Sequence, residues 1–291
     1  MGKQQTVEQL IDWYVREVGK QASWGRSKAY DLTRIKRYPI ARVAADRLTV
    51  RDYLDHAETR RVDGAGPATI GNDLVWLRQV LQSARVSLKT AVDLTALDDA
   101  RRELRTRKMI GKSKLRERRV SATEEQGVIA YFEGRDARLR IPMADIVRFA
   151  ILTSRRLEEI TRLQWDDLRR ETSTAWLDDV KHPTQKKGNR REFRIPAAAW
   201  EVIDRQRPDD IETASGAVFP FNPKSISTAF SRAAAFLELS DLRFHDLRHE
   251  ATSRLFERGY SIQEVAHFTL HESWTTLRRY THLKPSQVPE R

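Results

Sequence analysis

A polar stretch near the end of the chain, Leu242–Leu283, constrains the fold more than any other part of the sequence. It contains His245 and Arg248, three positions apart, and later His271 and Tyr280, nine positions apart. Residues three apart on a helix share one face, so we expect the first pair to lie together. Cationic side chains, two imidazole groups and a phenol in a very basic protein suit the binding of a phosphodiester.

This stretch also resembles a known family. Residues 245–249 read H-D-L-R-H, and residues 270–280 read L-H-E-S-W-T-T-L-R-R-Y. The pattern is similar to the C-terminal signature of the tyrosine recombinases, the phage integrase family. In that signature His-x-x-Arg is followed by Gly-His and then by the nucleophilic Tyr, nine positions after the second His. The match is specific because several fixed spacings agree at once, although Leu270 stands where the family has glycine.

Composition limits the class of protein. A chain of 291 residues favours two domains, and a net charge of +12 favours a polyanionic partner, although charge alone is a weak signal. Cysteine is absent, which excludes disulfides, zinc–thiolate sites and a thiol nucleophile. No apolar run approaches the length of a membrane span, and the N-terminus lacks a signal-peptide core. We therefore expect a cytoplasmic protein without a membrane partner, and the resemblance implies a bacterial, phage or mobile-element source.

The first 110 residues predict a small helical domain. Thr6 and Gln9 form a potential capping box, and apolar residues then recur at helical spacing. Further helices are predicted over Ser27–Tyr38, from Thr49 and from Pro67, the last with an apolar stripe of Ile70, Leu74, Leu77, Val80 and Leu81. Read alone, this is any four- or five-helix bundle. The resemblance implies a core-binding domain that clamps one face of a DNA site.

Residues 101–119 carry ten basic residues against two acidic ones. Such runs are usually solvated helix ends and linkers, but this one falls between two predicted domains. We therefore predict a basic linker over 111–120, between the helical domain (1–110) and a catalytic domain (121–291). We also expect several groups of this run to contact DNA phosphates.

The catalytic domain starts with a helix that Ser121 and Glu124 are expected to cap. A strongly apolar helix is predicted over Ile141–Leu152, followed by T-S-R-R-L-E-E. The family has T-G-x-R-x-x-E followed by L-x-W-x-D here. The resemblance therefore implies that Arg156 is the first catalytic arginine and Glu159 its supporting acid. Arg155 is interpreted as an exposed arginine at the helix start. Ser154 replaces the usual glycine.

A hairpin is predicted next, from a strand beginning at Thr174 and a partner beginning at Arg191. The expected fold class is thus mainly α with a small antiparallel sheet in the catalytic domain (α+β). In the family a lysine on this hairpin turn is a general acid. Lys181 suits the family spacing best, while Lys186 and Lys187 remain alternatives, and all three suit simple phosphate contact.

The resemblance implies a site-specific DNA recombinase or integrase. Arg156 and Arg248 would hold the non-bridging oxygens, Tyr280 would attack phosphorus to give a 3′-phosphotyrosyl link, and Lys181 would protonate the departing 5′ oxygen. His245 and His271 would donate to phosphate or help to deprotonate the phenol. No cofactor is required. Two alternatives stay open: a type IB topoisomerase-like relaxase, and an inactive DNA-binding accessory protein.

The implied partner is double-stranded DNA with specific recombination sites. Strand exchange through a Holliday junction implies a homotetramer on two sites. The first predicted helix begins within six residues of the N-terminus. We therefore expect either a recombinase that uses simple sites without an arm-binding domain, or a shortened chain.

Two histidine pairs, 245 with 249 and 267 with 271, have the helical spacing of metal ligands. No H-E-x-x-H motif accompanies them, and a metal site would leave the arginines unexplained. We therefore predict no metal and interpret His249 and His267 as structural residues.

Overall fold

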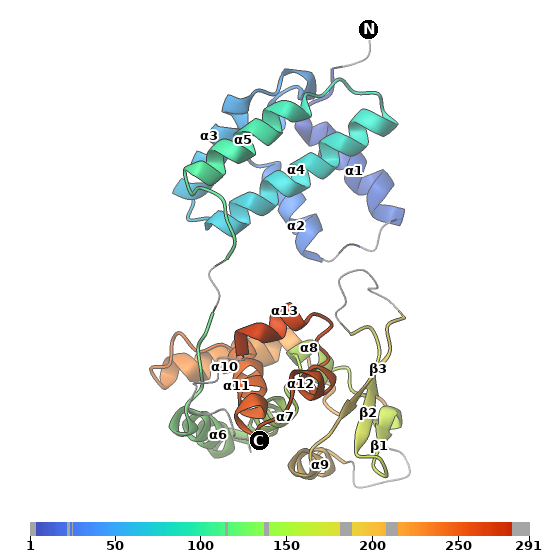
Figure 1. The fold of residues 1–291 in the computed structure, drawn as a ribbon, viewed down its shortest axis with the longest axis vertical. Helices are drawn as coiled ribbons and strands as arrows, with labels where there is room; N and C mark the ends of the chain where they lie inside the picture. The colour runs from blue at the N-terminus through green and yellow to red at the C-terminus, as the bar shows by residue number, and fades with distance from the viewer. Residues whose placement is uncertain are drawn as a thin grey trace. The chain divides into compact units, whose positions relative to one another are not determined.

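A computed structural model describes residues 4–21, 24, 26–113, 116–136, 140–180, 188–207 and 215–280. The chain divides into two compact units, Met1–Leu115 and Arg116–Arg291 (Figure 1). Both are mainly helical, and the second carries a three-stranded antiparallel sheet. The predicted fold class is therefore confirmed.

The first unit is a helical bundle. Its elements are α1 (Val7–Gln21), α2 (Arg26–Ile35), α3 (Val50–Val62), α4 (Pro67–Ser87) and α5 (Leu94–Thr106), with 3₁₀ turns η1 (Pro39–Arg42) and η2 (Ala45–Arg47). The predicted capping box is present, because the Thr6 amide donates to Gln9 Oε1 (3.0 Å) and the Gln9 amide to Thr6 Oγ1 (3.3 Å).

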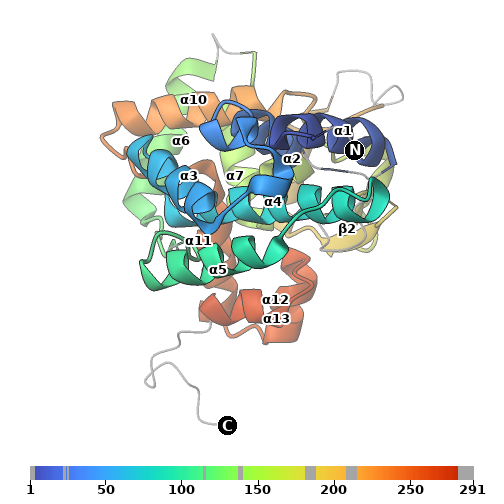
Figure 2. The ribbon, with the colours of Figure 1, turned by 90° about the horizontal axis from the view of Figure 1, so that it is seen from above.

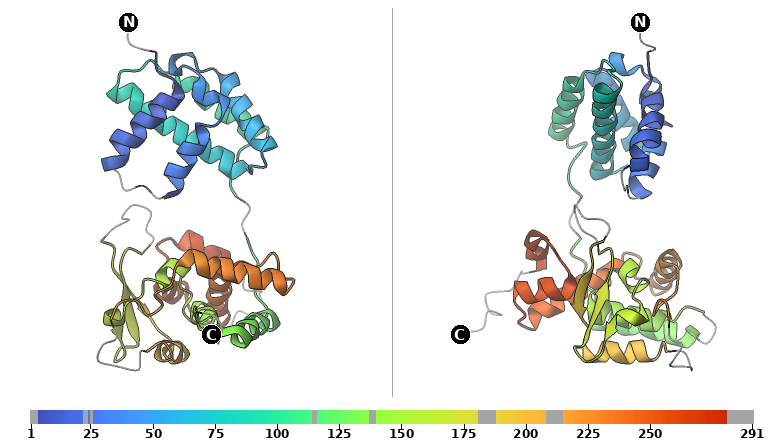
Figure 3. Two further views of the ribbon diagram at one scale, coloured as in Figure 1. Left: turned by 180° about the vertical axis from the view of Figure 1, so that it is seen from behind. Right: turned by 90° about the vertical axis from the view of Figure 1, so that its right-hand side faces the viewer.

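Helix α4 is the centre of this unit. It lies between α5 and α1 in Figure 3 and also packs against α2 and α3. The predicted stripe is confirmed, since Ile70, Leu74, Leu77, Val80 and Leu81 are all 0% exposed. Pro67 is accommodated at the first turn of the helix, where its missing N–H leaves no bond unmade.

A buried carboxylate, Asp73, joins three helices of the bundle. Its side chain is 0% exposed and pairs with Arg34 of α2 (2.7 Å) and Arg60 of α3 (2.8 Å). His56 Nε2 lies 3.4 Å away. Burial acts to raise the pKa of Asp73, but the imidazole and the two guanidinium groups outweigh it and hold the pKa below its usual value.

The second unit surrounds the apolar helix α7 (Met143–Thr153). The other helices are α6 (Ala122–Asp136), α8 (Leu157–Ile160), α9 (Ala197–Asp204), α10 (Pro223–Phe236), α11 (Phe244–Glu257), α12 (Ile262–Thr269) and α13 (Trp274–Leu277), with 3₁₀ turns η3 (Trp165–Asp167) and η5 (Arg278–Tyr280). Helix α7 packs against α6, α9 and α11. It begins two residues later than predicted because Pro142 occupies its N-cap.

The sheet has the strand order β1 (Leu168–Arg169), β2 (Thr174–Leu177) and β3 (Arg191–Arg194). Strands β2 and β3 are antiparallel, with Ala175 opposite Phe193, and both side chains face the core of the unit. The predicted pairing of these two strands is therefore confirmed. Helices α12 and α13 lie side by side beyond the end of α11 (Figure 2).

None of the helices that the structure describes is long and apolar enough to cross a membrane.

The change Asp73→Asn should lower the free energy of unfolding by about 3 kcal/mol, because it leaves the buried Arg60 guanidinium without its counter-charge. The pKa of Asp73 in the folded protein lies below the ordinary pKa of an aspartate, so its stabilising effect is fully present above that ordinary value. It is lost as the pH falls through the folded pKa, and the variant should lack this loss. Urea unfolding of the full chain at pH 7 and at pH 3 tests both effects.

Asp55→Asn is the matched control, since Asp55 is 51% exposed and pairs with Arg51 on the surface of α3. It should change the stability by about 0.5 kcal/mol or less. Equal effects of the two changes at pH 7 would contradict a stabilising role for the buried cluster.

Candidate active site

The turn between α7 and α8 positions the first arginine of the site. Ser154 ends α7 with φ 56° and ψ 26°, in the left-handed region. Arg156 is the N-cap residue of α8, and its amide donates to Glu159 Oε2 (3.1 Å). The Arg156 guanidinium binds Glu159 Oε1 at 2.6 Å and keeps 22% of its side-chain surface exposed. The arginine is thus fixed by the acid and still accessible from outside.

We expected Arg155 to be exposed, and this expectation is wrong. Its side chain is 1% exposed and is among the largest fully buried ones. Its Nε donates to the Thr153 carbonyl (3.2 Å) and its Nη2 to the Phe268 carbonyl (2.5 Å). The guanidinium lies over the Phe193 ring, 4.6 Å from its centroid. Burial lowers the pKa of Arg155 to about 10, so the group remains charged at neutral pH. Arg155 therefore ties α7 to β3 and α12.

Arg248, on α11, is 2% exposed and is aimed largely by main-chain atoms. Its Nη1 donates to the Ser154 carbonyl (2.5 Å), and its Nη2 donates to the Thr269 carbonyl (2.9 Å). The ends of α7 and α12 therefore fix this guanidinium. Burial lowers the pKa of Arg248 to about 9, which still leaves it charged at neutral pH.

Glu159 lies among three guanidinium groups. Its carboxylate is 2.6 Å from Arg156, 3.7 Å from Arg155 and 3.9 Å from Arg248. Burial acts to raise the pKa of Glu159, but the three cations outweigh it and lower the pKa to about 2. One negative charge among three positive ones leaves an excess of positive charge in the cluster, as an anion-binding site requires.

His271 lies beside Arg248, and its neutral form can be assigned from its neighbours. Thr269 Oγ1 donates its hydrogen to the Val265 carbonyl (2.6 Å), so this oxygen accepts from His271 Nδ1 (2.6 Å). The other ring nitrogen, Nε2, then accepts from Arg248 Nη2 (3.1 Å). Burial and the nearby arginines lower the pKa of His271 to about 2, consistent with a neutral ring.

Tyr280 meets this cluster from η5. Its hydroxyl is hydrogen-bonded to His249 Nδ1, and its ring centroid is 6.4 Å from that of His271. The ring also packs against a small apolar group of α11, α12 and α13. The structure thus places the hydroxyl beside a histidine that we had interpreted as structural. The signal was present in the sequence, since His249 follows Arg248 directly and lies one helical turn after His245.

His245 lies in the first turn of α11, one helical turn before His249. Its ring meets the His249 ring edge to face, with centroids 4.9 Å apart. It also lines an open pocket with Arg155 and Arg248, which continues to Ser231 and Arg243. Ion pairs, hydrogen bonds and ring contacts therefore connect the six described residues of the predicted site, with His249 as the link between His245 and Tyr280. These six are Arg156, Glu159, His245, Arg248, His271 and Tyr280.

The predicted general acid, Lys181, and its alternatives Lys186 and Lys187 lie outside the described residues. The hairpin is described up to Val180, whose amide donates to the Asn189 carbonyl (3.2 Å). Within the described part of the chain, no group of three His, Cys, Asp or Glu side chains is placed to hold a metal ion.

The sequence is similar to those of known proteins that form one family. Residues 118–287 match the family model described as "Phage integrase family". The chain belongs to this family. It is a tyrosine-type site-specific DNA recombinase. A shufflon-specific DNA recombinase of Escherichia coli is 28% identical over 98% of this chain and 71% of that protein. The integrase of Salmonella phage P22 is 28% identical over 51% of this chain and 41% of its own length.

Solved integrase structures share the fold of this recombinase. The Tn1549 transposon integrase in complex with transposon right end DNA has a TM-score of 0.74 and 14% identity, covering 97% of this chain and 96% of that one. A lambda integrase dimer bound to a core site has a TM-score of 0.71 and 16% identity, covering 98% of each chain.

The two departures of this recombinase from the family pattern share one backbone feature. Ser154 and Leu270 replace pattern glycines, and both adopt positive φ, 56° and 55°. Glycine takes this conformation at little cost, whereas a side chain costs about 1 kcal/mol. Ser154 is fully buried, and its hydroxyl bonds Thr252 Oγ1 (2.9 Å). Leu270 packs against the main core of its unit.

We expect Leu270→Gly to be about 1 kcal/mol more stable than Leu270→Ala. Both remove the packing of the leucine, but only glycine relieves the left-handed conformation that ends α12. At an ordinary helical position such as Ala266, replacement by glycine should instead cost about 1 kcal/mol. Urea unfolding of the variants tests this, and a Leu270→Gly protein less stable than Leu270→Ala would contradict the strain.

Proposed function

We propose that this recombinase cleaves a DNA strand by attack of Tyr280 on a backbone phosphorus held by Arg156 and Arg248. One observation carries the proposal: His271 accepts a hydrogen bond from Arg248 and lies beside the Tyr280 ring, so the nucleophile and the Arg248 guanidinium meet around a single side chain. The first unit would clamp the DNA, and the second would carry the chemistry.

The arginines supply what the phosphodiester needs before attack. A phosphodiester is a poor electrophile because its negative charge repels the nucleophile. Guanidinium forks bind two oxygens at once and offset that charge. Glu159 holds Arg156 and two backbone carbonyls hold Arg248, so both guanidinium groups are positioned before the phosphate enters.

The bond changes balance without a cofactor. The Tyr280 oxygen forms a bond to phosphorus, the bond from phosphorus to the 5′ oxygen breaks, and a 3′-phosphotyrosyl link results. The phenol proton passes to His249, whose Nδ1 is bonded to the hydroxyl. Lys181 would give the 5′ oxygen its proton. Attack by a 5′-hydroxyl from another strand then reseals the backbone and restores the free phenol.

We infer that this exchange runs through a Holliday junction held by four copies of the chain on two sites. The fold supports this inference, since a lambda integrase tetramer bound to a Holliday junction has a TM-score of 0.68 and 16% identity to this chain. The substrate would be double-stranded DNA with specific recombination sites.

The change Tyr280→Phe should abolish covalent trapping on a nicked suicide duplex that bears the recombination site. It removes only the attacking oxygen, so binding to the same duplex in a gel-shift assay should persist. Denaturing electrophoresis detects the covalent species. Equal trapping by wild type and variant would rule out Tyr280 as the nucleophile, and relaxation of any supercoiled plasmid without sequence preference would favour a topoisomerase.

His249 can be tested with two replacements. Asparagine places an amide where Nδ1 lies and so keeps a hydrogen bond to Tyr280, but it cannot take the proton, whereas alanine loses both functions. If His249 accepts the proton, both His249→Asn and His249→Ala should slow single-turnover trapping by about 10²-fold. A normal rate for the asparagine variant alone would reduce His249 to an orienting role.

A further inference from the structure

The basic segment between the two units does not end as a free cationic run. The arginines at its C-terminal end, Arg116 and Arg119, which belong to the second unit, bind carboxylates of α11. We expect several groups of this run to contact DNA phosphates. The last arginines of the run are engaged within the second unit, and the identity of their partners points to an additional role.

Arg116 forms a two-pronged ion pair with Asp246. Its Nε lies 2.7 Å from Asp246 Oδ1, and its Nη2 lies 2.7 Å from Oδ2. Asp246 is 1% exposed, and it also caps α11 by accepting from the Arg243 amide (2.8 Å). Arg116 therefore holds the carboxylate that fixes the first turn of α11, the turn that carries His245.

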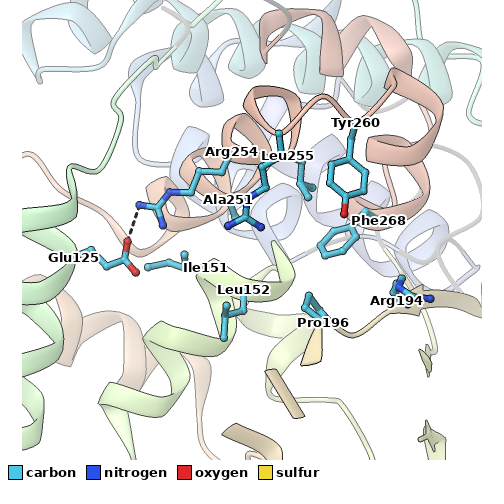
Figure 4. A pocket seen from close by; sticks show the side chains of 11 residues that line it. Glu125, Ile151, Leu152, Arg194, Pro196, Ala251, Arg254, Leu255, Tyr260 and Phe268 are labelled. Carbon is cyan, nitrogen blue, oxygen red and sulfur yellow. Dashed lines mark hydrogen bonds and ion pairs between the residues drawn. The ribbon is translucent and has the colours of Figure 1, made fainter. Parts of the chain in front are cut away.

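Arg119 forms the same kind of pair with Glu250, which lies one helical turn after Asp246 on α11. Its Nε lies 2.7 Å and its Nη2 3.1 Å from the two oxygens of Glu250, which is 3% exposed. The Val120 amide donates to Glu250 as well (3.0 Å). On the other side of Glu250, Arg254 bonds it at 2.8 Å and reaches Glu125 of α6 at 2.6 Å, a contact drawn in Figure 4.

These pairs matter because the carboxylates are buried. Burial acts to raise the pKa of Asp246 and of Glu250, but their arginine partners hold both values below the usual range. A buried carboxylate that loses its ion-pair partner is strongly destabilising. Loss of Arg116 would leave Asp246 without its guanidinium partner, and loss of Arg119 would leave Glu250 with Arg254 alone. The residues between the two carboxylates include Arg248 and His249.

We propose that Arg116 and Arg119 are positioning residues, which act through Asp246 and Glu250 to hold α11 and so place His245 and Arg248 for reaction with DNA. The proposal rests on the function proposed above.

Arg118 provides a matched control. It lies between the two arginines and carries the same charge, but its carboxylate partners, Glu124 (2.5 Å) and Asp241 (2.8 Å), both lie outside α11. Replacement of any of the three by glutamine removes one positive charge from the same segment. A role in phosphate binding predicts equal effects, whereas positioning of α11 predicts unequal ones.

The experiment compares Arg116→Gln, Arg119→Gln and Arg118→Gln in the full chain. Single-turnover trapping on the suicide duplex is measured at saturating protein, where DNA affinity no longer limits the rate. We expect the changes at 116 and 119 to lower this rate by about tenfold or more, because small displacements of catalytic groups are costly. The change at 118 should lower it less than about twofold.

A second readout does not depend on the reaction. In the protein without DNA, amide hydrogen exchange in α11 should become about tenfold faster in the 116 and 119 variants, while α4 in the first unit stays unchanged. Arg116→Lys, which keeps the charge and one hydrogen bond, should recover part of both effects and guards against general misfolding.

Equal trapping rates and equal α11 exchange in the three glutamine variants would overturn the proposal. If the wild-type protein does not trap DNA, the proposed function is wrong. Faster α11 exchange in the 116 and 119 variants than in the 118 variant would then still show that the two arginines hold α11. Circular dichroism of each variant checks that the chain is folded, and α11 exchange no faster than in the 118 variant counts against the proposal whatever the rates are.

Discussion

The concentration of positive charge in a buried place is the constraint on which the rest of the catalytic unit depends. A site for a phosphate diester needs several cations at close range, yet like charges repel and buried charges lose hydration. Glu159 offsets the repulsion between the cations, because its carboxylate lies 2.6, 3.7 and 3.9 Å from three guanidinium groups. The carbonyls of Ser154, Thr269 and Phe268 take further N–H groups. The cations are thus held in place before any phosphate arrives.

Helix α11 carries out two tasks from different sides. On one side, Arg248 belongs to the cationic group and His249 bonds Tyr280. On the other side, Asp246 and Glu250 bind arginines of the segment that precedes α6. The helix is held in part by its buried apolar residues, but its buried charged groups also need partners. The ion pairs of Asp246, Arg248 and Glu250 are therefore part of the geometry of the site.

Much of the arrangement followed from local patterns in the sequence. The apolar stripe of α4, the Thr6 capping box and the pairing of β2 with β3 all rest on neighbours close in the chain, for which periodicity is informative. The contact of Arg156 with Glu159 has the same origin, because the two are three residues apart.

Long-range contacts were not accessible in this way. Arg155 and Arg156 are identical neighbours, and what distinguishes Arg155 is its contact with the Phe193 ring and its hydrogen bond to the Phe268 carbonyl. His249 had the spacing of a metal ligand or of a structural residue, and its partner Tyr280 is 31 positions away. The carboxylates that engage Arg116 and Arg119 are 130 and 131 positions away, so the sequence left only a run of charge.

The way in which Arg248 is aimed bears on how freely such a site can vary. Two of its hydrogen-bond acceptors are carbonyl oxygens of the main chain, at Ser154 and Thr269. No point substitution deletes a carbonyl oxygen, so these anchors survive any exchange of side chain that preserves the local backbone. Positions 154 and 270 hold Ser and Leu where the family pattern has glycine, and both have a positive φ. The direction of the Arg248 guanidinium is therefore set by the shape of two backbone turns rather than by the identity of the side chains in them.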